Sequence, residues 1–66
     1  MREALLVEWR GDFGWAMVEG RRCFIHWRAF PVGTRRSLHH GLRLKVADIT
    51  PDVPSPRIGR AVIEER

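Results

Sequence analysis

The chain has 66 residues, and its twelve Lys and Arg against eight Asp and Glu give a formal net charge of +4 and a sequence pI near 11.0. A chain of this length forms one small domain, near the lower limit for folding on a hydrophobic core alone. The single cysteine, Cys23, excludes an internal disulfide and has no Cys or paired-His partner at zinc-site spacing. We therefore expect residues 1–66 to form one domain that its core stabilises.

The sequence contains no long apolar segment. The apolar run near the N-terminus is too short for a signal peptide, and nowhere do about eighteen apolar residues follow one another. We therefore expect a cytoplasmic protein without membrane association. The basic charge favours a polyanionic partner, although an Arg-rich chain without Asn, Gln or Tyr is also typical of GC-rich or heat-adapted genomes. Arg is the residue best suited to bidentate phosphate contacts and to stacking on bases.

The first half of the chain predicts three short strands in succession. A Leu- and Val-rich segment, about residues 3–9, forms the first strand, and Arg10-Gly11-Asp12 supplies a tight turn into the second, residues 13–18. Glu19-Gly20 then joins this strand to a third one that ends near Trp27.

The length of the Glu19-Gly20 loop decides which side chains share a face. A two-residue loop places three cross-strand pairs on one face: Trp15 with Phe24, Phe13 with His26, and Met17 with Arg22. A four-residue loop would preserve the faces but change the pairs. The opposite face receives small and aliphatic residues, namely Gly14, Ala16, Cys23 and Ile25. Rings displayed beside a guanidinium predict a platform on which bases stack.

The second half predicts a turn, a loop and two further strands. Residues 28–30 favour a short helical turn that Pro31 ends, and residues 32–40 form a loop. Apolar residues alternate with Arg43 and Lys45 from Leu42 to Val46, which predicts a strand with one buried face. Three prolines within residues 50–56 exclude a central strand there, and about residues 58–64 form the last strand.

Five short strands with a longer connection after the third favour a closed barrel over an open sheet, because closure hides the strand edges. We therefore predict an all-β fold, a five-stranded antiparallel Greek-key barrel.

Two segments carry a more specific resemblance. Phe13-Gly14-Trp15 and Phe24-Ile25-His26-Trp27 are similar to the two nucleic-acid-binding motifs of the cold-shock domain family, and Trp9 matches the tryptophan that ends the family's first strand. Similarity continues through residues 29–44 and 56–62. The resemblance implies a compact OB-fold that binds single-stranded RNA or DNA, and a role as an RNA chaperone or as a regulator of transcription or translation.

The chain departs from this family in its first strand and its long loop. Glu8-Trp9-Arg10 replaces a Lys-Trp-Phe-Asn run, and the segment that follows is about three residues shorter. Thr34 or Arg35 replaces the aromatic residue that caps the family's binding surface. We expect binding that is weaker than in a standard member, or differently placed.

The face assignment and the resemblance together predict ten nucleic-acid-binding residues. Four of them stack bases: Phe13, Trp15, Phe24 and His26. Trp9 and Trp27 extend the platform, although their places at strand ends are equally compatible with packing at the barrel rim. Four arginines lie along the phosphate backbone: Arg10, Arg22, Arg28 and Arg35.

Catalysis is not expected. The sequence has no nucleophile beside a base, no paired carboxylates at a plausible spacing and no phosphate-binding glycine loop, so we predict neither enzymatic activity nor a cofactor. His39-His40 has no third metal ligand nearby and is expected to lie in a solvated turn. The alternative is a protein-interaction module that docks a partner protein on the same aromatic face, and a monomer is favoured.

Overall fold

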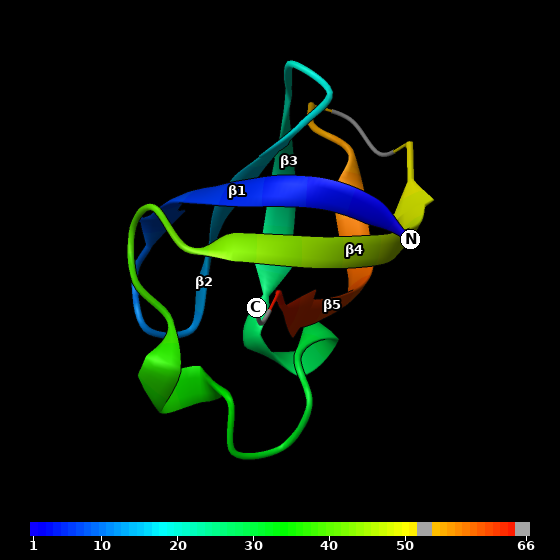
Figure 1. The fold of residues 1–66 in the computed structure, drawn as a ribbon. Helices are drawn as coiled ribbons and strands as arrows, with labels where there is room; N and C mark the ends of the chain where they lie inside the picture. Colours follow the sequence, from blue (N-terminus) through cyan, green and yellow to red (C-terminus); the bar gives the residue numbers. More distant parts are fainter. Residues whose placement is uncertain (52–53, 65–66) are drawn as a thin grey trace.

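The computed structural model describes residues 1–51 and 54–64, except for the side chain of Arg35. These residues form five strands and two single-turn 3-10 helices (Figure 1): β1 (Arg2–Trp9), β2 (Phe13–Val18), β3 (Arg21–His26), η1 (Trp27–Ala29), η2 (Arg35–Ser37), β4 (Arg43–Thr50) and β5 (Arg57–Ile63). The strands close into a barrel in the order β1-β2-β3-β5-β4. The prediction of an all-β, five-stranded closed barrel is confirmed.

One pair of strands contradicts the predicted antiparallel arrangement. β3 and β5 run parallel, with Phe24 beside Arg57 and Ile25 beside Ile58, while the other four adjacent pairs are antiparallel. Strand directions can alternate around a closed ring only when the number of strands is even. A closed barrel of five strands therefore contains at least one parallel pair. Here that pair is β3 and β5, because β5 follows β4 in the chain and lies between β3 and β4 in the barrel.

The β2–β3 hairpin has the two-residue loop. Glu19 and Gly20 have φ angles of 50° and 79°, as a type I′ turn requires at both central positions. The predicted pairs are all present: Trp15 with Phe24, Phe13 with His26, and Met17 with Arg22. The loop length therefore fixes the register, and the register fixes the faces.

The inner face of the barrel carries the core. Its largest fully buried side chains are Leu6, Ile25, Leu44, Ile58, Val46 and Cys23. Burying an aliphatic side chain of this size stabilises the fold by about 1.5–3 kcal/mol. The alternation predicted for the fourth strand is confirmed, because Leu44 and Val46 are buried while Arg43 and Lys45 are exposed.

A β-bulge in β1 changes which side chains face inward. Leu6 pairs with Ala16, but the next pairs are Glu8 with Trp15 and Trp9 with Gly14, so that Val7 is the extra residue. Simple alternation from the buried Leu6 would have turned Glu8 inward and Trp9 outward. The bulge reverses both, and this reversal decides the chemistry of the outer face.

The connection after β3 begins with the predicted helical turn, one residue earlier than expected. The hydrogen bond that closes this turn runs from the N–H of Phe30 to the carbonyl oxygen of Trp27. Phe30 itself is extended, with φ −96° and ψ 153°, because it precedes Pro31. No helix among the described residues is long and apolar enough to cross a membrane.

Candidate nucleic-acid interface

Three rings lie in mutual contact on the outer face of β2 and β3, and we call Phe13, Trp15 and Phe24 the ring cluster. The ring centroids lie 5.6 Å apart for Phe13 and Trp15, 5.8 Å for Phe13 and Phe24, and 5.9 Å for Trp15 and Phe24. The two Phe rings are stacked at 26°, and Trp15 meets both of them edge-on. All three side chains are half-buried, in contrast to the inner face of the same strands.

Arg22 lies at one end of the ring cluster. Its guanidinium carbon is 4.8 Å from the ring centroid of Trp15, within the range of a cation–π interaction. Among the predicted phosphate-binding arginines whose side chains the structure describes, Arg22 is the one that lies against a ring of the cluster.

Glu8 occupies the position beside Trp15 on β1 and pairs with two of the predicted arginines. Its carboxylate accepts a hydrogen bond from Nε of Arg10 at 2.6 Å and one from Nη2 of Arg22 at 3.4 Å. The bond from Arg10 is the largest cause that lowers the pKa of Glu8; desolvation opposes it, and the charges of Arg10, Arg22 and His40 add to it. Arg10 and Arg22 are therefore already engaged by an anion of the same chain.

A second group lies where β3 runs into η1. The ring centroids of His26 and Trp27 are 5.7 Å apart, and the guanidinium carbon of Arg28 is 5.6 Å from the Trp27 ring. Nδ1 of His26 accepts a hydrogen bond from the amide of Arg28 at 3.3 Å, so in the neutral ring Nε2 carries the proton. Phe13 pairs with His26 across the hairpin, which makes this group continuous with the ring cluster.

These three residues line a hollow of about 590 Å³ between β3, η1 and β5. Arg57, Ile58 and Gly59 of β5 line its other side. The volume lies within the range of about 300–1,000 Å³ typical of small-ligand sites.

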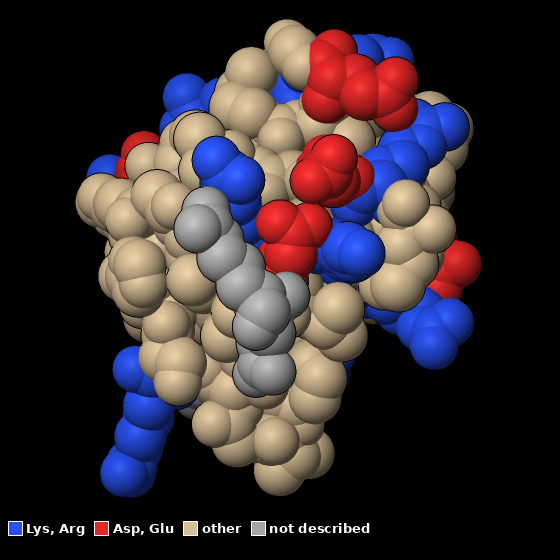
Figure 2. Space-filling model, in the orientation of Figure 1, with Lys and Arg blue, Asp and Glu red and all other residues tan. Residues whose placement is uncertain are grey.

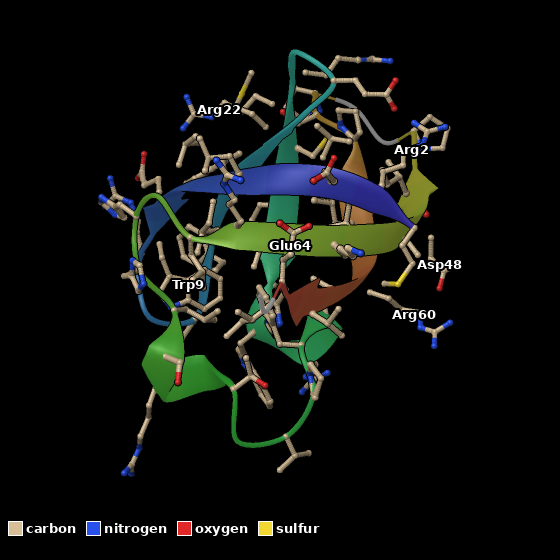
Figure 3. All side chains as sticks on the ribbon, viewed as in Figure 1. Arg2, Trp9, Arg22, Asp48, Arg60 and Glu64 are labelled. Carbon is tan, nitrogen blue, oxygen red and sulfur yellow. The ribbon has the colours of Figure 1, made fainter. Side chains whose placement is uncertain are left out.

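Trp9 does not lie with the ring cluster. Its ring meets Phe30 edge-on at a centroid distance of 5.7 Å and packs against the core. A Cβ atom added to Gly14 would lie 2.9 Å from the Trp9 ring, so the indole covers Gly14 on the inner face. In Figure 3, Trp9 and Arg22 lie on different sides of β1. The structure favours rim packing for Trp9 over an extension of the platform.

The position of Arg57 was not predicted from the sequence. Because β3 and β5 are parallel neighbours, Arg57 lies beside Phe24, and one row of residues crosses four strands: Glu8, Trp15, Phe24 and Arg57. The parallel pair was not predicted, so nothing in the sequence assigned Arg57 to this surface. The side chain of Arg35, the remaining predicted residue, lies outside the described residues.

Basic side chains do not form a uniform field over the molecule. Figure 2, which looks onto β1 and β4, shows acidic side chains between the basic ones on this face. Exposed ion pairs such as Arg2 Nη1 with Glu19 Oε1, at 3.1 Å, account for part of this mixing. The net charge alone therefore does not mark a binding face.

Comparisons with known protein families and curated proteins do not assign this chain to a family. A scan against models of protein families gave no match to this sequence, and no curated protein sequence matched it. Within the described residues, no three His, Cys, Asp or Glu side chains gather into a group that could hold a metal ion.

Proposed function

We propose that the protein binds single-stranded nucleic acid on the outer face of β2 and β3, as a cold-shock-type domain with an OB-fold, and that it acts by binding rather than by catalysis. The observation that carries this proposal is the ring cluster, three contacting aromatic side chains that remain half-exposed on the outer face of β2 and β3, while the inner face of the same strands carries small and aliphatic core residues. Each base that stacks on such a ring contributes about 1–3 kcal/mol to binding.

The barrel topology supports the same proposal. In the OB-fold, a five-stranded Greek-key barrel, the face of strands two and three binds oligonucleotides. The ring cluster occupies the corresponding strands in a barrel ordered β1-β2-β3-β5-β4.

The roles of the individual residues follow from their geometry. Phe13, Trp15 and Phe24 offer faces and edges for successive bases, and Nε2–H of His26 is a donor for a base carbonyl oxygen. Arg28, next to the ring of Trp27, is placed to follow the backbone into the hollow. Stacking tolerates every base, so sequence preference should be slight. Capture of unpaired strands in this way would suit an RNA chaperone or a regulator of transcription or translation.

A fluorescence titration tests the proposal. Addition of a short oligothymidylate at low salt should quench tryptophan emission, and the affinity should fall steeply as salt rises, with a slope of about −0.7 in log K per phosphate contact. Emission that stays unchanged at low salt would contradict the proposal.

The alternative, a partner protein docked on the same face, is favoured by one feature. Leu5, which is 42% exposed, pairs with Met17 and extends the ring cluster as an aliphatic surface across β1. A protein ligand would bury this extension, so Leu5→Asn, which adds no charge, should weaken a protein complex and leave oligothymidylate binding unchanged.

A further inference from the structure

The outer face contains an anion at the position where a bound strand needs cations. Glu8 is held there by the bulge at Val7, which pairs it with Trp15 instead of turning it into the barrel. Its side chain is 28% exposed, and its two oxygens reach Arg10 and Arg22 at 2.6 and 3.4 Å. A carboxylate that accepts from two guanidinium groups offers them what a phosphate oxygen would offer.

The same contact orients Arg22 relative to the ring cluster. While Nη2 of Arg22 points to Glu8, its guanidinium lies 4.8 Å from the centroid of Trp15. A base that stacks on this part of the indole has to share it with the guanidinium or displace it. Arg22 leaves the ring freely only when its bond to Glu8 is broken.

We propose that Glu8 is a specificity-determining residue, an intramolecular ligand of Arg10 and Arg22 that competes with the phosphates of a bound strand for these two arginines. The proposal rests on the proposed function, and it concerns the strength and selectivity of binding rather than its existence. A phosphodiester strand gains these contacts only by displacing the carboxylate. A ligand with fewer charges fails to displace it and meets a surface whose nearest cations are neutralised.

The expected size of the effect follows from the exposure of the pairs. Ion pairs between exposed side chains are each worth at most a factor of about five in an equilibrium constant. Removal of the carboxylate from two such pairs should therefore strengthen phosphodiester binding by about 3- to 10-fold. The lowered pKa of Glu8 agrees with a carboxylate that Arg10, Arg22 and His40 hold in its charged form.

The test compares two substitutions with the same change of charge. Glu8→Gln keeps the shape of the side chain and removes its charge. Glu3→Gln changes the net charge equally but lies on β1 at about 15 Å from Glu8, at the ~3.3 Å rise per residue of a strand. This distance exceeds the Debye length of about 10 Å at ~0.1 M salt. The probe is an oligothymidylate of roughly eight nucleotides, within the usual site size of a small barrel.

Glu8→Gln should bind this probe about 3- to 10-fold more tightly than wild type, and Glu3→Gln less than about 2-fold more tightly. The gain should vanish with a methylphosphonate oligothymidylate, which has no backbone charge. It should also vanish when Arg10 and Arg22 are both replaced by Gln, because the coupling passes through them.

Equal affinities of Glu8→Gln and Glu3→Gln would overturn the inference, as would a gain that survives the uncharged backbone or the loss of both arginines. In these cases wild type still binds, so the proposed function stands. If neither wild type nor Glu8→Gln binds the probe, the proposed function fails and this inference fails with it.

A second measurement needs no variant. In a carbon-13 NMR titration of the wild-type carboxyl groups, the pKa of Glu8 should rise when oligothymidylate is added, because the phosphates take over Arg10 and Arg22. The carboxyl of Glu3 serves as the internal reference. A Glu8 pKa that stays the same at saturation would contradict displacement.

Discussion

Trp15 and Phe24 form a cross-strand pair on the outer face of the barrel, with ring centroids 5.9 Å apart and an interplanar angle of 78°. The next residues along the same strands, Ala16 and Cys23, are 0% and 2% exposed and belong to the core. One hairpin therefore supplies both the stabilising face and the ring face, and substitutions on the two faces should separate stability from binding.

Replacing Trp15 or Phe24 by Ala should weaken oligothymidylate binding about 5- to 100-fold each, since a stacked base is worth ~1–3 kcal/mol. The fold should persist, because both side chains lie outside the core cluster. Leu44→Ala is the control for the inner face and should cost about 2–5 kcal/mol of unfolding free energy. Urea unfolding and fluorescence-independent binding, such as calorimetry, measure the two effects. Unfolding of Trp15→Ala would show that the ring is part of the core.

Replacement of Trp9 in β1 should destabilise the fold more than replacement of Trp15 in β2. Trp9 packs on Phe30 and covers Gly14, so Trp9→Ala should lower the free energy of unfolding by roughly 3 kcal/mol. Trp15→Ala should lower it by only about 1–2 kcal/mol, through the lost contacts with Phe13, Phe24 and Arg22. Chemical denaturation of both variants measures this difference. The reverse order of stabilities would contradict the placement of Trp9.

The hairpin turn offers a stabilising substitution. Glu19 has a φ of 50°, which costs a residue with an ordinary side chain about 1 kcal/mol. Asn tolerates this region and precedes Gly in favourable type I′ turns. The comparison is best made in an Arg2→Gln background, because Glu19 pairs with Arg2 at 3.1 Å. There, Glu19→Asn should raise the free energy of unfolding by about 0.5–1 kcal/mol, and a loss of stability would argue against the two-residue loop.

Close approach of β1 to β2 makes Gly14 irreplaceable. A Cβ atom at this position would collide with the carbonyl oxygen of Glu8, so Gly14→Ala should destabilise the fold by about 3 kcal/mol or more. Gly41→Ala is the control: its φ is 87°, but an added Cβ has nothing within 4 Å. This variant should cost only the backbone strain of about 1–2 kcal/mol. Thermal melts of the two proteins should rank them in this order.

The pH dependence of stability should contain a contribution from Glu8. Its pKa in the folded protein lies below the ordinary value of 4.5, mainly because of the bond from Arg10. The contribution is therefore fully present above pH 4.5 and is lost as the pH falls through the folded pKa. Glu8→Gln should flatten the acid limb of the stability curve, as denaturant unfolding at a series of pH values would show. An unchanged acid limb would contradict the ion pairs of Glu8.

The part of this architecture that depends on local spacing could be predicted from the sequence. Alternation across Glu19-Gly20 determines which residues of β2 and β3 face outward, because a strand has a side-chain period of two and the loop leaves little freedom of register. The same period of two predicts that Leu44 and Val46 of β4 are buried, as the structure shows.

The bulge and the parallel pair could not be predicted in this way. A bulge inserts a residue without a required residue type, so alternation along β1 cannot assign a face to Glu8 and Trp9, the two residues that follow Val7. The contact of Phe24 with β5 depends on how the barrel closes, and residues 24 and 57 are far apart in the sequence. Together these features place Glu8 and Arg57 in one row with Trp15 and Phe24, and the bulge directs Trp9 toward Phe30.

The most direct measurement is an NMR titration of the nitrogen-15-labelled protein with a short oligothymidylate at low salt. The account predicts chemical-shift changes concentrated on β2, β3 and η1, with the indole N–H of Trp15 shifting strongly and that of Trp9 little. Saturating oligonucleotide that leaves these resonances unmoved, or that shifts only β4 and the outer side of β5, would contradict it.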